Sequence, residues 1–243
     1  MANDFTAIDS FGWDALKKAL NQRVVVNSYR LIPSRRNRVW VVETDVRPVV
    51  VKQSLSGRCG TEFETLLLAR QAGIDVPYPL FKEGDFLVMD YIPGETCEVM
   101  INHLFSSVAA EKAGKWLADF HEQLAFGGSP RVMGDAVLSN FIMGEERLFG
   151  IDLEDCGKGD PFDDIGQLAA SILGSEPFFT PIKFDLCMHM IARYEKAAHV
   201  DVREKARPFV AKHLRIDARR KPLFRRTLLA AAKSLEKSWP ELA

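Results

Sequence analysis

The sequence from Arg131 to Asp164 reads RVMGDAVLSNFIMGEERLFGIDLEDCGKGDPFDD, and the interpretation of the whole chain starts from it. Asp135 is followed five residues later by Asn140, and Asp152 stands at the end of a later apolar run. Between Asn140 and Asp152 an apolar run, a polar turn and a second apolar run predict a short hairpin. A loop, a hairpin and a turn can bring these three polar side chains together. A carboxylate can accept a proton, and carboxylate and amide oxygens are ligands for a hard divalent cation.

Upstream, three β-branched runs at residues 24–26, 38–44 and 48–52 predict an antiparallel meander. The third run ends in Lys52. A lysine that ends an apolar strand is usually a solvated edge residue. We give Lys52 a binding role only because Asp135 and the polar residues after it follow in the same chain.

The stretch 131–164 resembles the aminoglycoside and choline phosphotransferase branch of the protein-kinase-like superfamily. That branch typically shows His-Gly-Asp-(x)4-Asn, then Ile-Asp-x-Glu, then Gly-Asp-Pro-x-x-Asp-Leu. The corresponding residues here are Met133-Gly134-Asp135 with Asn140, Ile151-Asp152-Leu153-Glu154, and Gly159-Asp160-Pro161 with Asp164-Ile165. Parts of the pattern are also similar to lipopolysaccharide core sugar kinases and to the KEOPS atypical kinase. Met133 departs from the pattern, because the family usually has a histidine there that braces the loop.

The resemblance implies an α+β fold, the bilobal protein-kinase-like fold. Residues 1–93 would form an N-lobe with a small antiparallel sheet and a helix, and residues 94–243 a mainly helical C-lobe with the catalytic loop, the metal site and the acceptor pocket. From their hydrophobic patterns, helices are expected at residues 9–21, 61–72, 107–124, 184–198, 202–214 and 222–235. The first is expected to place Phe11, Leu16 and Leu20 at helical spacing, and the third to bury Val108, Ala113, Trp116, Leu117, Phe120 and Leu124.

The resemblance also implies ATP and Mg²⁺ as cofactors, bound in the cleft between the lobes, and transfer of the γ-phosphoryl group to a hydroxyl. Asp135 would orient and deprotonate the acceptor. Asn140 and Asp152 would hold the metal ion.

Lys52 would reach the α and β phosphates of the nucleotide, held by a glutamate of the helix at residues 61–72. Glu62 and Glu64 are both candidates for this pairing. They lie about 200° apart around a helix, so only one of them can face Lys52. The spacing typical of the family favours Glu62.

Two further segments are expected to contact the nucleotide. The loop at residues 32–38 contains Ser34, Arg35, Arg36 and Asn37, and its backbone N–H groups and Ser34 would face the phosphates; the alternative is a basic surface hairpin. Backbone groups of Asp90, Tyr91 and Ile92 would hydrogen-bond adenine, an expectation that rests on position in the chain alone.

Three more residues have expected roles near the loop. His121 resembles the family histidine that supports the catalytic loop from behind, although a lone histidine beside an apolar stripe is more often a satisfied core residue. Asp164 matches the family aspartate that accepts hydrogen bonds from the loop, and it also suits a helix N-terminus. Glu154 would approach a second metal ion or bind water.

Composition indicates an ordinary soluble globular protein of 243 residues, 47% hydrophobic and 27% charged, with a net charge of −1. The polar, acidic start at Met1–Phe5 predicts no signal peptide. No apolar run approaches the roughly 18 residues that span a bilayer. The four cysteines are scattered without a Cys-x-x-Cys pair, which argues against a zinc site and a disulfide framework and favours a reducing, cytoplasmic setting.

The stretch from Lys196 to Arg226 is strongly basic. One interpretation is an anionic partner or a membrane surface; the other is a solvated helical face balanced by acids elsewhere. Nucleic acid is not expected.

The motifs leave three functions open. The first is a small-molecule kinase acting on a sugar, an aminoglycoside, an amino alcohol or a lipopolysaccharide core sugar. The second is an atypical Ser/Thr protein kinase, and the third is a nucleotide-binding pseudokinase that acts as a scaffold. The Ile-Asp-x-Glu and Gly-Asp-Pro patterns, without an activation loop ending in Ala-Pro-Glu, favour the first. The chain contains neither a P-loop nor a Gly-x-Ser-x-Gly elbow, and the match of its acidic stretch to a calcium loop is poor.

Overall fold

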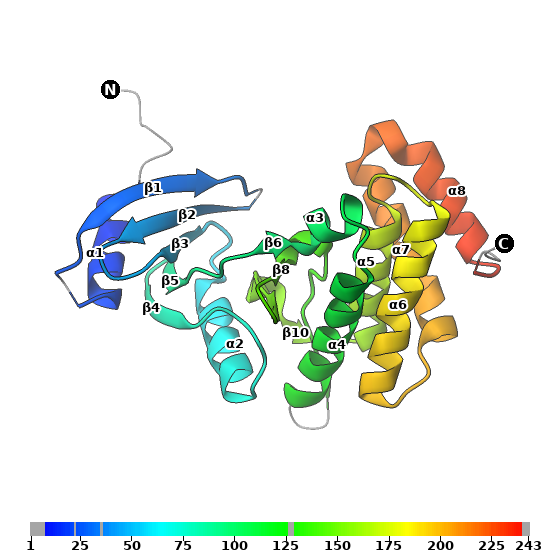
Figure 1. The fold of residues 1–243 in the computed structure, drawn as a ribbon, viewed down its shortest axis with the longest axis horizontal. Helices are drawn as coiled ribbons and strands as arrows, with labels where there is room; N and C mark the ends of the chain where they lie inside the picture. The colour runs from blue at the N-terminus through cyan, green and yellow to red at the C-terminus, as the bar shows by residue number, and fades with distance from the viewer. Residues whose placement is uncertain (1–7, 22, 35, 126–128, 240–243) are drawn as a thin grey trace.

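The structure, a computed structural model, describes residues 8–21, 23–34, 36–125 and 129–239. It has two lobes, a smaller one built on a sheet and a larger one built mainly of helices (Figure 1). The predicted α+β bilobal fold is therefore confirmed. The division between residues 93 and 94 stays a prediction, and the start at Met1–Phe5 lies outside the described residues.

The smaller lobe contains a five-stranded antiparallel sheet in the order β1-β2-β3-β5-β4. Its strands are β1 (Val26–Ile32), β2 (Asn37–Thr44), β3 (Val49–Ser54), β4 (Pro79–Glu83) and β5 (Phe86–Asp90). The predicted meander is confirmed, but its first strand was placed too early, at residues 24–26. Most of β1 is exposed, so it lacks the alternation of buried and exposed residues that identifies a strand in a sequence. The short strand β4 was not expected.

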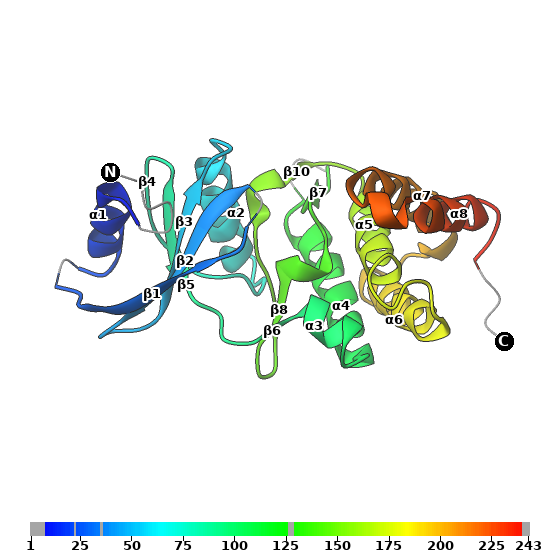
Figure 2. The same cartoon turned by 90° about the horizontal axis from the view of Figure 1, so that it is seen from above.

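The two faces of this sheet are covered by different helices (Figure 2). Helix α1 (Ser10–Ala19) packs against β4, β5 and β3. Its Leu16 belongs to one buried cluster with Val49 and Val51 of β3. Successive side chains of a strand point to opposite faces. Lys52 therefore points to the other face, toward Glu62 of helix α2 (Cys59–Gln71).

Two residues expected on the apolar faces of predicted helices are exposed. The side chain of Phe11 is 72% exposed, because α1 turns Gly12, Ala15 and Leu16 toward the sheet. Val108 is 57% exposed in the first turn of helix α4 (Ser107–Gln123), whereas the other residues predicted for this buried face are buried.

After β5 the chain continues with β6 (Glu95–Thr96) and α3 (Cys97–Asn102). The predicted hairpin is confirmed as β8 (Phe141–Met143) and β9 (Leu148–Gly150), and β6 pairs with β8. A second small sheet joins β7 (Arg131–Val132) to β10 (Gly157–Lys158). Both small sheets flank the loop at residues 133–140, so the short strands hold the ends of that loop.

Four more helices complete the larger lobe: α5 (Pro161–Leu173), α6 (Pro181–Ala198), α7 (Arg203–Arg220) and α8 (Arg225–Leu235). Short 3₁₀ turns lie at η1 (Leu138–Asn140), η2 (Leu153–Asp155) and η3 (Pro222–Phe224). Helix α4 packs on α6, α5 on α7, and α7 on α8. None of the helices in the described ranges is long and apolar enough to cross a membrane.

Candidate functional site

The loop that contains Asp135 is held from below by Asp164, in the first turn of α5. The Asp164 carboxylate accepts the backbone N–H of Met133 at 2.5 Å and that of Gly134 at 3.0 Å. Nε2 of His121 lies 3.0 Å from the same carboxylate, and its Nδ1 lies 2.9 Å from the Tyr194 hydroxyl. The support expected from His121 and Asp164 is therefore confirmed. The loop is braced although a buried methionine occupies position 133.

Two other residues of α5 continue this support. Gln167 Oε1 accepts the N–H of Ala136 at 3.1 Å, and the Ser171 hydroxyl accepts the N–H of Leu138 at 3.2 Å. The amide nitrogen of Gln167 donates to a carboxylate oxygen of Asp135 at 2.9 Å. One side of α5 thus fixes both the loop backbone and the Asp135 side chain.

Gly134 is required by the geometry of this loop. Its φ is +80°, a region that residues with a side chain rarely adopt, and a Cβ atom there would lie 2.5 Å from the Asp155 carbonyl oxygen. The close approach packs the loop directly against the segment that follows Asp152.

Asp135 is half-buried beside Asn140 and Gln167. Burial raises the pKa of the Asp135 carboxyl, and the negative charge of Asp152 raises it further. Arg36, the hydrogen bond from Gln167 and Arg220 lower this pKa, but the net shift is upward. A carboxylate with a raised pKa is a stronger proton acceptor, which suits a general base.

Asn140 and Asp152 lie at the same end of the β8–β9 hairpin. The N–H of Ile151 donates to the Asn140 carbonyl at 2.9 Å, so Asp152 follows directly after a residue paired with Asn140. The Asn140 amide nitrogen donates to the Asp135 carbonyl at 2.9 Å. Asp152 has φ +60° and ψ +57°, a left-handed conformation that costs an ordinary residue roughly 1 kcal/mol and that aspartate tolerates better than most.

Lys52 is the centre of a buried charge cluster. Its ammonium lies 2.7 Å from Glu62 and 3.7 Å from Glu154, and it also donates to Asp152. Of the two candidate glutamates, Glu62 pairs with Lys52, and Glu64 is exposed on the other side of α2. The expected pairing is confirmed.

The ionisation of this cluster reflects three carboxylates around one ammonium. Burial lowers the pKa of Lys52, but Glu62 and Asp152 outweigh burial and the net shift is upward, so the lysine is charged. Burial raises the pKa of Glu62 to about 7, against the opposing effect of Lys52 and with a contribution from Asp152. In this cluster negative charge exceeds positive charge, which favours the binding of a further cation.

Glu154 has a role that its sequence position did not indicate. It is buried, and its carboxylate accepts hydrogen bonds from Asn37 at 3.1 Å and from Ser56 at 3.3 Å. The side-chain oxygen of Asn37 accepts the backbone N–H of Leu55 at 3.2 Å. Both the oxygen and the nitrogen of the Asn37 side-chain amide are therefore hydrogen-bonded within the protein. Ser34 accepts the N–H of Asn37 at 3.3 Å, while Arg35 lies outside the described residues.

Two arginines of the smaller lobe meet the larger lobe at Asp155. Arg36, in the β1–β2 connection, lies 2.6 Å from one carboxylate oxygen, and Arg58, just before α2, pairs with the other. These contacts lie next to the Asn37–Glu154 hydrogen bond, so the β1–β2 connection is joined to η2 by charge and by hydrogen bonding.

The segment expected near adenine begins at the end of β5. The N–H of Asp90 donates to the Tyr78 carbonyl at 3.0 Å, and its carboxylate lies 3.0 Å from Arg47. Tyr91 and Ile92 follow β5 directly and are half-buried. Their contact with a nucleotide stays a prediction.

The donor set suits a hard divalent cation. The ligand atoms of Glu62, Asp152 and Glu154 lie within 4.8 Å of one another. Asn140 uses its amide nitrogen on Asp135, and no donor among the described residues reaches its amide oxygen. Oxygen ligands of this kind fit Mg²⁺. Asp152 belongs both to the carboxylate group Glu62, Asp152 and Glu154 and to the predicted metal ligands, Asn140 and Asp152. That Asn140 and Asp152 bind the metal ion stays a prediction.

Several residues of this site were missed in the sequence. Gln167 and Ser171 stand three and seven residues after Asp164, which places three polar residues on one side of a mainly apolar helix. That periodicity was the available signal. The sequence gives no comparable signal for Arg58, Ser56 and Tyr194, because their partners lie far away along the chain.

A sequence profile described as the phosphotransferase enzyme family matches residues 28–132 and ends before Asp135. A search of curated proteins finds no match.

Solved structures with the same fold span nearly the whole chain. The gentamicin complex of APH(2")-IIa has a TM-score of 0.60 and 17% identity, covering 96% of this chain and 97% of that one. Amicoumacin kinase hAmiN, in complex with AMP-PNP, Ca²⁺ and Ami, has a TM-score of 0.65 and 13% identity, with 93% of each chain covered. A choline/ethanolamine kinase family protein from Mesorhizobium loti has a TM-score of 0.64 and 14% identity, covering 87% of this chain and 89% of that one. The chain therefore has the protein-kinase-like fold found in the aminoglycoside and choline phosphotransferase branch, and the profile match confirms its resemblance to that branch.

Proposed function

We propose that this protein is an ATP-dependent phosphotransferase that moves the γ-phosphoryl group of ATP to a hydroxyl of a small molecule. The observation that carries the proposal is the cluster of Lys52 with Glu62 and Asp152, next to a loop that holds Asp135 against Asn140. Two structures of similar fold support the choice of nucleotide: the complex of amicoumacin kinase hAmiN with AMP-PNP and the ternary complex of APH(2")-IIa with streptomycin and ATP.

In this proposal Lys52 binds the α and β phosphates, and Glu62 keeps its ammonium in place. Asn140 and Asp152 hold Mg²⁺, which when bound neutralises charge on the β and γ phosphates. The N–H groups near Ser34 and Asn37 face the phosphates, and backbone groups of residues 90–92 contact adenine.

Asp135 acts on the acceptor. The acceptor oxygen attacks the γ-phosphorus, the bond from that phosphorus to the oxygen bridging to the β-phosphate breaks, and ADP leaves with the bond electrons. Asp135 orients the attacking hydroxyl and takes its proton. Gln167 holds one carboxylate oxygen of Asp135 at 2.9 Å, and the other oxygen, which accepts a longer 3.4 Å hydrogen bond from the Asn140 amide, would receive the acceptor's proton.

The acceptor, in our proposal, carries negative charge, as a lipopolysaccharide core sugar bearing phosphate or carboxylate groups would. Arg220 acts electrostatically on Asp135, lowering its pKa. No carboxylate of the described residues lies within ion-pair distance of Arg220, or of its exposed neighbours Arg219, Arg225 and Arg226. Positive charge beside the acceptor position attracts anions and disfavours a polycationic aminoglycoside. A cytoplasmic setting remains part of the proposal.

The test is transfer from γ-labelled ATP to a panel of phosphorylated sugars, neutral sugars, amino alcohols, aminoglycosides and generic protein substrates. We expect a labelled small-molecule product, fastest with anionic sugars. Asp135→Ala should abolish transfer and leave nucleotide binding intact, because Asp135 is not a phosphate ligand.

Two outcomes would overturn the proposal. Labelled protein with no labelled small molecule would identify an atypical protein kinase. ATP binding without transfer to any acceptor would identify a pseudokinase scaffold.

A further inference from the structure

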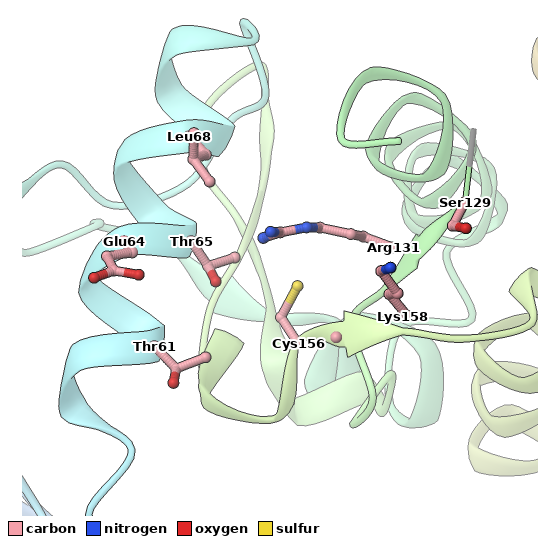
Figure 3. Close-up of a pocket in the computed structure, with 9 residues that line it drawn as sticks. Thr61, Glu64, Thr65, Leu68, Ser129, Arg131, Cys156 and Lys158 are labelled. Atoms are coloured by element: carbon pink, nitrogen blue, oxygen red, sulfur yellow. The ribbon is translucent and has the colours of Figure 1, made fainter. Parts of the chain in front are cut away.

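A small pocket lies on the side of α2 that faces β7 and β10, away from the Glu64 carboxylate (Figure 3). Its volume is about 170 Å³. The side chain of Arg131 extends across it toward Thr65, and Lys158 and Ser129 lie on the β7–β10 side. These residues have no part in the phosphotransferase proposed above.

Two cations in this pocket face each other across a strand pair. Lys158 is the register partner of Arg131 in the β7–β10 ladder, and like charges directly opposite in a sheet repel one another. Within the part of the chain that the structure describes, neither cation has a carboxylate within ion-pair distance. Glu64 borders the pocket, but its carboxylate points away from Arg131 (Figure 3). The pocket therefore concentrates positive charge that no carboxylate of the described residues compensates.

The remaining groups can donate hydrogen bonds without adding charge. The hydroxyls of Thr61, Thr65 and Ser129 border the pocket, and Thr65 is almost fully buried. Burial raises the pKa of the Cys156 thiol, although hydrogen bonds from Thr65 and Arg131 oppose the shift, so Cys156 is a neutral group at neutral pH. Cations and hydroxyl donors around one space are the chemistry that binds oxyanions.

The volume of the pocket limits the size of the ligand that it can hold. Pockets for drug-sized ligands occupy roughly 300 Å³ or more. A space of about 170 Å³ therefore suits a small ion with some ordered water. We propose that this pocket binds a dianionic phosphoryl group, either free orthophosphate or the phosphate of a small monoester.

The position of the pocket gives such a ligand a structural effect. Thr65 lies one turn after Glu62 on α2, and Lys158 follows the Asp152–Asp155 segment by a few residues. A bound oxyanion would connect α2 directly to β10. It would stabilise the folded protein by binding only to it, whatever the protein's catalytic activity.

The test is isothermal titration calorimetry with potassium phosphate and with O-phosphoserine, at ionic strength held constant with KCl so that non-specific screening is the same throughout. Saturable binding to the wild type is expected. Arg131→Gln and Lys158→Gln should each weaken it by about tenfold. Lys233→Gln, an exposed lysine of α8, is the matched control and should bind like the wild type.

A second control separates this pocket from the charge cluster around Lys52. Lys52→Met should retain phosphate binding, and loss of binding in that variant would place the anion at Lys52 and overturn the proposal. Absence of saturable binding, or wild-type affinity in the double variant Arg131→Gln/Lys158→Gln, would overturn the proposal too.

If Arg131→Gln does not fold, Lys158→Glu at its exposed position gives the same test. Preference for O-phosphoserine identifies a monoester ligand, and preference for phosphate identifies the free ion.

Discussion

Nε2 of His121 lies 3.0 Å from a carboxylate oxygen of Asp164, and that oxygen also accepts the backbone N–H of Met133 at 2.5 Å. A helix of the larger lobe is thus connected through one carboxylate to the loop that contains Asp135. Because the contact is made to the backbone, it does not depend on which side chain occupies position 133. This explains how the loop is held without the histidine that is usual in the family it resembles.

Asp164→Asn tests this connection. Asparagine presents one acceptor oxygen instead of two, so one of the N–H groups of Met133 and Gly134 loses its partner inside the protein. The free energy of unfolding should fall by about 1–3 kcal/mol in urea denaturation. Asp119→Asn, which removes an exposed ion pair with Lys115 on α4, is the control and should change it by about 0.5 kcal/mol or less. Equal effects of the two substitutions would show that Asp164 does not hold the loop.

Glu62→Gln and Glu64→Gln form a matched pair on one helix. Glu62 is buried 2.7 Å from Lys52, and Glu64 is exposed. Removing the charge of Glu62 releases the Lys52 ammonium from its position, so we expect ATP to bind about tenfold more weakly. Glu64→Gln should bind ATP like the wild type. Fluorescence titration with a nucleotide analogue would measure both, and a loss in Glu64→Gln alone would contradict the assignment.

Gln167→Ala examines positioning of the proposed base. The substitution removes a hydrogen bond that lowers the pKa of the Asp135 carboxyl, so that pKa should rise. A base must be deprotonated to act, so the acidic limb of the kcat profile should move to higher pH. We expect kcat to fall by about tenfold or more while KM for ATP stays the same. Gln71→Ala, at the exposed end of α2, is the control. An unshifted pH profile would mean that Gln167 supports the fold only.

Lys183 predicts a pH dependence of stability. It is fully buried on α6, where its ammonium contacts the Ile172 carbonyl at 3.2 Å and the Ser175 hydroxyl at 3.1 Å, and it also donates to Asn102. Burial lowers the pKa of Lys183 to about 8. Between that pH and the ordinary lysine pKa the unfolded chain binds more protons, so the free energy of unfolding should rise with pH.

Urea denaturation at pH 7 and at pH 9.5 would measure this effect in the wild type and in Lys183→Met. The wild type should gain about 2 kcal/mol more than the variant over this interval, because only the wild type loses the buried proton. Identical gains would mean that Lys183 has an ordinary pKa in the folded protein.

Much of the fold and of the candidate site could be predicted from local patterns. The residue pattern in the stretch 131–164 predicts the hairpin. The resemblance to the family implies the pairing of Lys52 with Glu62, whereas helix periodicity shows only that Glu62 and Glu64 cannot both face Lys52. The ends of the exposed strand β1 could not be predicted, because most of its residues are exposed and show no alternation of buried and exposed positions. Phe11 and Val108 fit the apolar spacing of their helices but are exposed. Periodicity shows that a helix has an apolar side, but it does not show where the element packed against that side ends.

Contacts between distant segments were beyond the sequence. Glu154 binds Asn37 and Ser56, and the pairing of Arg131 with Lys158 arises only when β7 and β10 align. The roles of these residues come from the approach of elements that lie far apart along the chain.

The most direct measurement of the central claim is calorimetric binding of ATP, with Mg²⁺ and with EDTA, to the wild type and to Asp152→Ala. If Asp152 and Lys52 hold one nucleotide and its cation, the wild type should bind ATP more tightly with Mg²⁺, and Asp152→Ala should lose that gain. Equal affinity with and without Mg²⁺ in the wild type, or an unchanged gain in Asp152→Ala, would contradict it.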